Sequence, residues 1–67
     1  MEKEIIIERV RTEGMKRIMR LIEGSVGAFI YDEGEETRIC TFENMHEAVI
    51  PTLEIEGIEI KRVEDAI

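Results

Sequence analysis

Residues 4–24, EIIIERVRTEGMKRIMRLIEG, hold the two patterns that decide the fold. The stretch 4–10 begins with three consecutive isoleucines between charged residues, and so short a β-branched run predicts a strand. Because this run is apolar without alternation, we expect a strand that is covered on both faces or central in its sheet. Thr12 can then cap a helix over residues 13–23 by accepting a hydrogen bond from a free amide, and Gly24 is expected to end it.

The predicted helix is amphipathic. Its apolar residues recur at steps of three and four and cover one arc, while its bases occupy the opposite arc. The apolar arc consists of Met15, Ile18, Met19, Leu21 and Ile22, and the basic arc of Lys16, Arg17 and Arg20. The apolar arc is therefore expected to pack on a sheet.

The middle of the chain predicts a hairpin followed by a short helix. Residues 27–31 and 37–42 are rich in β-branched and aromatic residues, and the polar residues 32–36 between them are typical of a hairpin loop. Phe42, Met45 and Val49 then recur at helical spacing. We expect this second helix to end near Val49, because a proline, here Pro51, disfavours helix at the residue before it.

The tail over residues 53–63 alternates between apolar and polar residues, but the alternation changes phase at Glu56 and Gly57. A tight hairpin turn at these two residues would pair Ile55 with Ile58. The same hairpin would place Glu54 opposite Glu59, which is unfavourable. A single strand with a bulge at Gly57 is the alternative.

The predicted order is strand, helix, strand, strand, helix, strand over one domain, residues 1–67. This order indicates an α+β fold, the ferredoxin-like plait, with two helices on one face of an antiparallel sheet. The residues in phase on each element form the predicted core, which consists of Ile5, Ile7, Ile18, Ile22, Ile30, Ile39, Met45, Val49 and Ile60.

Composition restricts the class of protein. A 67-residue chain buries only about 60% of its unfolded surface, so its stability margin is thin. Its 14 Glu, 12 Ile, single Asn and lack of Gln resemble thermophile proteins. One cysteine excludes an internal disulfide, and the sequence has neither a signal-peptide pattern nor an apolar run long enough for a membrane span. We expect a soluble cytoplasmic protein with no membrane partner.

The charges are segregated along a chain whose net charge is −7. Five of the nine bases fall within residues 9–20 with one acid, whereas residues 23–59 hold ten acids and one base. A basic face on an acidic body fits an acidic partner or a second copy of the chain. A solvated helix with internal ion pairs is the plainer interpretation. The candidate contacts for an acidic partner are Arg11, Lys16, Arg17 and Arg20.

The sequence contains few residues of the types that form catalytic or metal sites. Cys40 and His46 are each the only residue of their type, whereas structural zinc needs four ligands. Ser25 is the only serine, and Cys40 lies in a predicted strand, where a free cysteine is usually a small core residue. We therefore expect no catalytic residues, no metal, no cofactor and no enzymatic activity.

Residues 38–44, a short helix and residues 57–64 resemble the last strand, helix and strand of an RNA-recognition motif. This resemblance implies a plait topology and raises RNA binding as a possible function. RNA-recognition motifs stack bases on aromatic side chains of the two central strands. The corresponding positions here hold Ile6, Thr37 and Ile39, with Glu36 at the glycine position, so only the topology is shared.

Three function classes follow. The preferred hypothesis is a non-enzymatic interaction or assembly module, acting as a homodimer or as a subunit of a larger complex. The alternative is a nucleic-acid-binding accessory protein that uses the basic face of the first helix, although the net charge of −7 disfavours it. The third is a small-ligand-sensing regulatory domain, because residues 12–14 occupy the ligand-loop position of plait domains that bind amino acids.

The dimer hypothesis depends on the sheet face that the helices leave uncovered. Several residues out of phase with the core are apolar, and an exposed apolar patch is typical of an interface. The candidate interface residues are Ile6, Phe29, Tyr31, Cys40 and Phe42.

Overall fold

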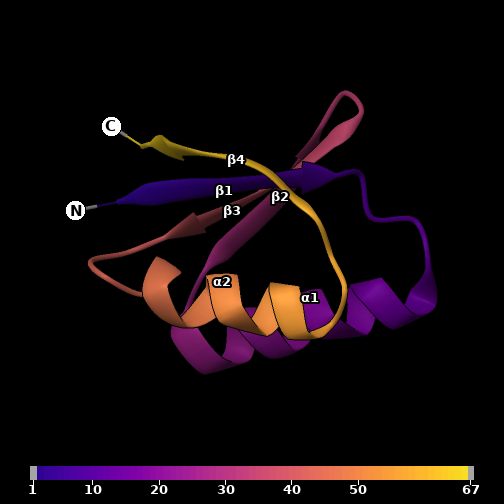
Figure 1. Cartoon of the computed structure of the whole chain (residues 1–67), viewed down its shortest axis with the longest axis horizontal. Coiled ribbons are helices and arrows are strands. Elements are labelled where there is room, and N and C mark those ends of the chain that lie inside the picture. Colours follow the sequence, from indigo (N-terminus) through magenta and orange to yellow (C-terminus); the bar gives the residue numbers. More distant parts are fainter. Residues whose placement is uncertain (1, 67) are drawn as a thin grey trace.

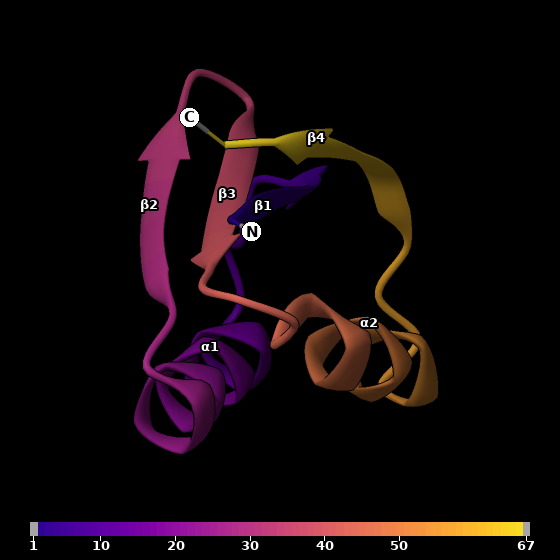
Figure 2. The same ribbon diagram turned by 90° about the vertical axis from the view of Figure 1, so that its left-hand side faces the viewer.

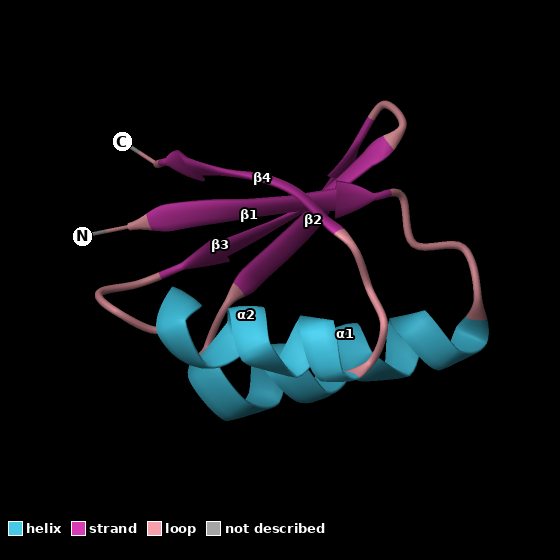
Figure 3. Ribbon diagram, in the orientation of Figure 1, coloured by secondary structure: helices cyan, strands magenta, loops and turns pink. Residues whose placement is uncertain are grey.

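The computed structural model describes residues 2–66 and has a four-stranded antiparallel sheet with two helices on one face (Figures 1 and 2). The strand order is β2-β3-β1-β4, so β1 is central and β2 and β4 are the edges. Figure 3 shows both helices on the same side of the strands. The predicted ferredoxin-like α+β plait is confirmed. Its elements are β1 (Lys3–Glu8), α1 (Glu13–Val26), β2 (Phe29–Glu33), β3 (Glu36–Thr41), α2 (His46–Ile55) and β4 (Ile60–Asp65).

The isoleucine run forms the centre of the sheet. Ile5, Ile6 and Ile7 are all fully buried, as expected for a strand that is covered on both faces. Ile5 and Ile7 face the helices and belong to a buried cluster of ten residues, in which each large aliphatic side chain contributes about 1.5–3 kcal/mol. The cluster consists of Ile5, Ile7, Val10, Met19, Ile22, Ala28, Ile39, Val49, Leu53 and Ile58.

Helix α1 begins as predicted and ends one turn later than predicted. The Thr12 hydroxyl accepts a hydrogen bond from the Met15 amide at 3.2 Å. Gly24 lies inside the helix, and Gly27 ends it, with φ +72° and its amide donating to the Glu23 carbonyl. The prediction of Gly24 as the terminator is wrong, because one more turn packs Val26 against the core.

The predicted hairpin is confirmed as β2 and β3. Glu33 pairs with Glu36, so the connecting turn contains only Gly34 and Glu35. Gly34 has φ +60°, a conformation that glycine adopts at little cost and that tight hairpins require.

Helix α2 differs most from the sequence prediction. It starts at His46 and runs to Ile55 with Pro51 inside it, so the prediction of an end near Val49 is wrong. Proline in a helix interior costs about 3 kcal/mol. The turn that follows Pro51 fully buries Leu53, and this burial offsets the cost.

Because α2 continues through residue 55, residues 53–63 form neither a hairpin nor one bulged strand. Gly57, with φ +77°, lies in the turn after α2, and β4 starts only at Ile60. A shift in the β1–β4 register is present, but it falls between the Ile6–Arg62 and Ile7–Ile60 pairs and leaves Lys61 as the extra residue. Both open alternatives for this segment are therefore wrong.

The core prediction holds for most residues. Five of the nine are buried, and Ile18, Ile30 and Ile60 pack partly buried against the cluster. Met45 is exposed, because it lies at the N-cap of α2 and the buried stripe of that helix runs through Val49 and Leu53. In residues 2–66, neither helix is long and apolar enough to cross a bilayer.

Candidate interaction surfaces

The sheet face opposite the helices, called the open face here, carries charged and aromatic side chains. Alternation along each strand places every second residue on this face. The register then aligns these residues in rows across the sheet, one of which runs from Tyr31 through Arg38 and Ile6 to Arg62. The open face consists of Glu4, Ile6, Glu8, Phe29, Tyr31, Glu33, Glu36, Arg38, Cys40, Arg62 and Glu64.

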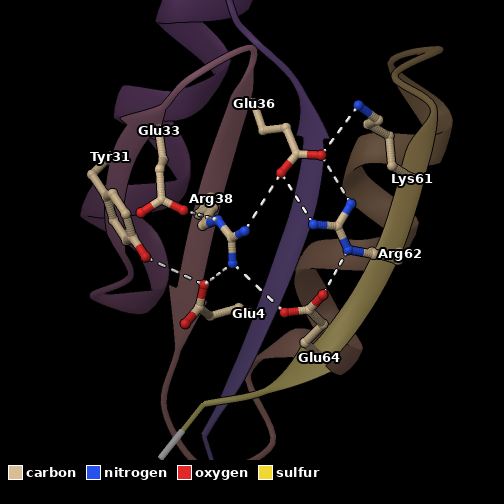
Figure 4. Close-up of polar contacts among 8 residues, drawn as sticks. All are labelled: Glu4, Tyr31, Glu33, Glu36, Arg38, Lys61, Arg62 and Glu64. Carbon is tan, nitrogen blue, oxygen red and sulfur yellow. Dashed lines mark hydrogen bonds and ion pairs between the residues drawn. The ribbon is translucent and has the colours of Figure 1, made fainter.

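Arg38 is at the centre of an ion-pair network on the open face (Figure 4). Its guanidinium lies 3.1 Å from Glu4 and 3.3 Å from Glu33. Two further carboxylates, those of Glu36 and Glu64, lie 3.5 and 3.6 Å away. The hydrogen bond to Glu4 raises the pKa of Arg38, although desolvation opposes this shift. One base therefore connects acids from all four strands.

Glu36 connects this network to the edge strand β4. Its carboxylate accepts hydrogen bonds from Arg62 at 2.9 and 3.1 Å and lies 3.2 Å from the Lys61 ammonium. These two bases, Arg62 foremost, lower the pKa of Glu36 to about 2. Side chains at successive strand positions normally point to opposite faces, and the irregularity at Lys61 lets both neighbours reach one carboxylate.

The network covers the centre of the open face. Ile6 lies directly opposite Arg38 on one side and Arg62 on the other, and it is 0% exposed. The expectation that Ile6 contributes to an exposed apolar patch is not met, because charged side chains cover it. Among the residues of the RNA-recognition resemblance, Thr37 and Ile39 are also buried and cannot stack on a base.

The other candidate interface residues lie at one end of the sheet. Phe29 and Tyr31 are neighbours on β2, with ring centroids 5.6 Å apart, and Phe29 is 62% exposed. Cys40 pairs with Phe29 across the strands and is half-buried, and Phe42 is exposed just after β3. The structure therefore brings Phe29, Tyr31 and Cys40 together and leaves Phe42 beyond the strand end.

Two titratable groups at this end have raised pKa values. Burial, followed by the charge of Glu4, raises the pKa of the Cys40 thiol. The same two causes raise the pKa of Tyr31, whose hydroxyl donates to Glu4 at 3.3 Å. Both groups are thus held in their neutral forms at neutral pH, which opposes the use of either as a nucleophile.

The basic residues of the sequence window are divided in the fold. Arg11 pairs with Glu35 at the hairpin turn, 2.7 Å away, and Lys16 lies 3.8 Å from Glu13. Arg17 and Arg20 are exposed on α1 and form no ion pair within residues 2–66. The four candidate contacts for an acidic partner therefore do not form one free basic face.

Sequence reasoning missed an apolar groove of about 250 Å³ between the two helices. Leu21, 64% exposed, lies on one wall, and Ala48 and Thr52 lie on the other. The amphipathic pattern of α1 contained part of this signal, since Leu21 extends the apolar arc away from the sheet. The other wall could not be predicted, because it includes Thr52, which lies beyond the point where the sequence predicts that the second helix ends.

Within residues 2–66, the structure contains no group of three or more His, Cys, Asp or Glu side chains placed to hold a metal ion. Comparison of the chain with protein-family models, curated proteins and solved structures gave no match.

Proposed function

We propose that this protein is a non-enzymatic interaction module that acts by self-association, as a homodimer or as a repeated subunit of a larger complex. The observation that supports this most is the balance between buried and exposed apolar residues. A core cluster of ten residues stabilises the fold, while six large apolar side chains of the described chain remain exposed. They are Leu21, Phe29, Phe42, Met45, Ile55 and Val63.

A second copy is the partner that suits a chain with so small a core. In a domain of this size, the free energy gained by burying apolar surface exceeds the cost of lost conformational entropy by only a small amount. Association stabilises the fold further, because it removes more apolar surface from water. An exposed apolar side chain is removed from water when it becomes part of an interface, and contiguous apolar patches are typical of such surfaces. A closed two-fold assembly is the commonest arrangement that uses one surface on both partners.

The charged groups of the open face support a role in binding over a role in catalysis. Acid–base catalysis needs a group whose pKa lies near the working pH. The pKa of Glu36 is instead lowered to about 2, and that of Arg38 is raised. Both therefore stay ionised at neutral pH and act as fixed charges that can orient a partner.

Sedimentation equilibrium from low to high micromolar concentration tests the proposal. We expect a species of twice the 7.8 kDa chain mass. A 7.8 kDa monomer at every concentration, at both low and high salt, would refute self-association. Purification from the native organism then distinguishes a homodimer from a subunit that is found with other chains.

A further inference from the structure

The edge strand β4 offers an unpaired backbone edge. It pairs with β1 on one side, and no other element of the described chain lies beyond it (Figure 2). The Ala66 amide donates to the Glu2 carbonyl at 3.1 Å, which fixes the phase of the hydrogen bonds between these strands. Because backbone groups alternate in direction along a strand, the amides and carbonyls of Val63 and Asp65 point away from β1.

The charges along this edge are arranged as a self-complementary series. Residues 61–65 read Lys, Arg, Val, Glu, Asp, with two bases on one side of Val63 and two acids on the other. In an antiparallel pair of identical strands related by a two-fold axis, one residue faces its own copy at the centre. Centring the pair on Val63 places every base opposite an acid.

Other centres within residues 61–65 are unfavourable. Centring on any of the four charged residues places that residue directly opposite its own copy, and like charges directly opposite destabilise a strand pair. The Val63 centre also agrees with the backbone, because the outward amide and carbonyl of Val63 can bond reciprocally to those of its copy. The charges therefore select the Val63 register, and the hydrogen-bond phase of β4 is compatible with it.

We propose that two copies of the chain pair antiparallel through β4, with Val63 at the two-fold axis, to form one continuous eight-stranded sheet. This inference rests on the proposed self-association and specifies its surface. Val63, which is 41% exposed, contacts the second copy's Val63. On the open face, Arg62 lies beside the second copy's Glu64, and the symmetric pair repeats this contact.

Ion pairs within the monomer already orient the charged side chains of β4. Arg62 is held by Glu64 at 2.6 Å within its own strand and by Glu36 at 2.9 Å, so its guanidinium is oriented before association. Asp65 is already paired with Lys3 and Lys61 with Glu36, so the charge complementarity of the pairing rests on Arg62 and Glu64. The opposite edge, β2, carries Asp32 and Glu33 without a base, so its self-pairing gains no charge complementarity.

Proline at position 63 provides a selective test. Its missing amide removes two of the proposed intermolecular hydrogen bonds by symmetry and none of those between β1 and β4, and edge strands tolerate proline at an outward position. We expect Val63→Pro to keep the circular-dichroism spectrum of the parent and to lose the dimer in sedimentation equilibrium. Phe29→Ser, at the other edge of the sheet, is the matched control and should remain dimeric.

A cross-linking experiment tests the register and does not depend on how well the proline variant folds. In a Cys40→Ala background, Val63→Cys should form an interchain disulfide on mild oxidation, because directly paired strand residues lie within disulfide range. In the same background, Asp65→Cys should not, because the register offsets the two introduced thiols by four residues, roughly 13 Å along the strand.

These experiments distinguish failure of the β4 pairing from failure of self-association itself. A dimer that survives Val63→Pro, or that gives no disulfide from Val63→Cys, would overturn the β4 pairing and leave self-association standing. If Phe29→Ser alone yields a monomer, the interface lies at the β2 end of the sheet. A parent protein that is monomeric throughout would overturn both.

Discussion

Replacement of Ile6 by alanine should destabilise the protein as strongly as a core substitution, although Ile6 lies on the sheet face that has no helix over it. Its side chain is 0% exposed beneath Arg38 and Arg62. Truncating a buried isoleucine to alanine costs about 2–5 kcal/mol. A 67-residue domain has a total stability of about 3–10 kcal/mol at 0.05–0.15 kcal/mol per residue. The substitution therefore removes a large part of the margin.

Urea denaturation followed by far-ultraviolet circular dichroism measures this loss. Ile6→Val should cost about 0.5–1.5 kcal/mol, because only one methylene is removed. Leu21→Ala is the apolar control, since Leu21 is 64% exposed and surface substitutions usually change stability by about 0.5 kcal/mol or less. If Ile6→Ala and Leu21→Ala give the same urea midpoint, the charged network does not shield the Ile6 side chain from water.

Four further predictions concern single positions. The folded-state pKa of Glu36 is about 2, below its ordinary 4.5, so it contributes stability that is present above pH 4.5 and lost as the pH falls through 2. Denaturation curves should therefore show that the destabilisation by Glu36→Gln shrinks between these pH values, and a constant difference would contradict the pairing with Arg62. Pro51→Ala should raise the melting temperature, because alanine restores an amide donor inside α2, and a lower melting temperature would indicate that the helix needs the proline ring. Alkylation of Cys40 by iodoacetamide at pH 8 should be slower than that of a free cysteine, because its raised pKa reduces the thiolate fraction, and an equal rate would contradict its burial. Gly27→Ala should lower the melting temperature, since alanine is strained at φ +72°, whereas Gly24→Ala, inside the helix, should raise it.

Local patterns in the sequence predict the elements whose signals lie within one segment. The isoleucine run predicts β1, and Thr12 predicts the start of α1, because a cap and its amide partner are three residues apart. The rule for Pro51 is equally local, and it fails. Leu53 is held by the sheet, and the free energy of that long-range burial outweighs a preference between chain neighbours.

The open face shows a second limit of local reasoning. Alternation correctly places Ile6 on the face away from the helices, but it does not reveal what lies above the side chain. The covering bases, Arg38 and Arg62, come from strands on both sides, 32 and 56 residues further along the chain. Only the strand register brings them together, and the register of β4 depends on where α2 ends.

The segregation of charge along the sequence has an intramolecular use. Arg9 donates to the Gly34 carbonyl at 2.8 Å, and its backbone amide donates to the Glu35 carbonyl at 3.0 Å. Arg11 pairs with the Glu35 carboxylate. The bases after β1 therefore hold the acidic hairpin turn, which lies more than 20 residues away in the chain. Each surface pair contributes only about 0–1 kcal/mol, so these contacts fix the position of the hairpin more than they stabilise the fold. The charges at β4 differ from these, because two bases and two acids flank Val63 within one strand, and the proposed antiparallel pairing would place each base opposite an acid of the second copy.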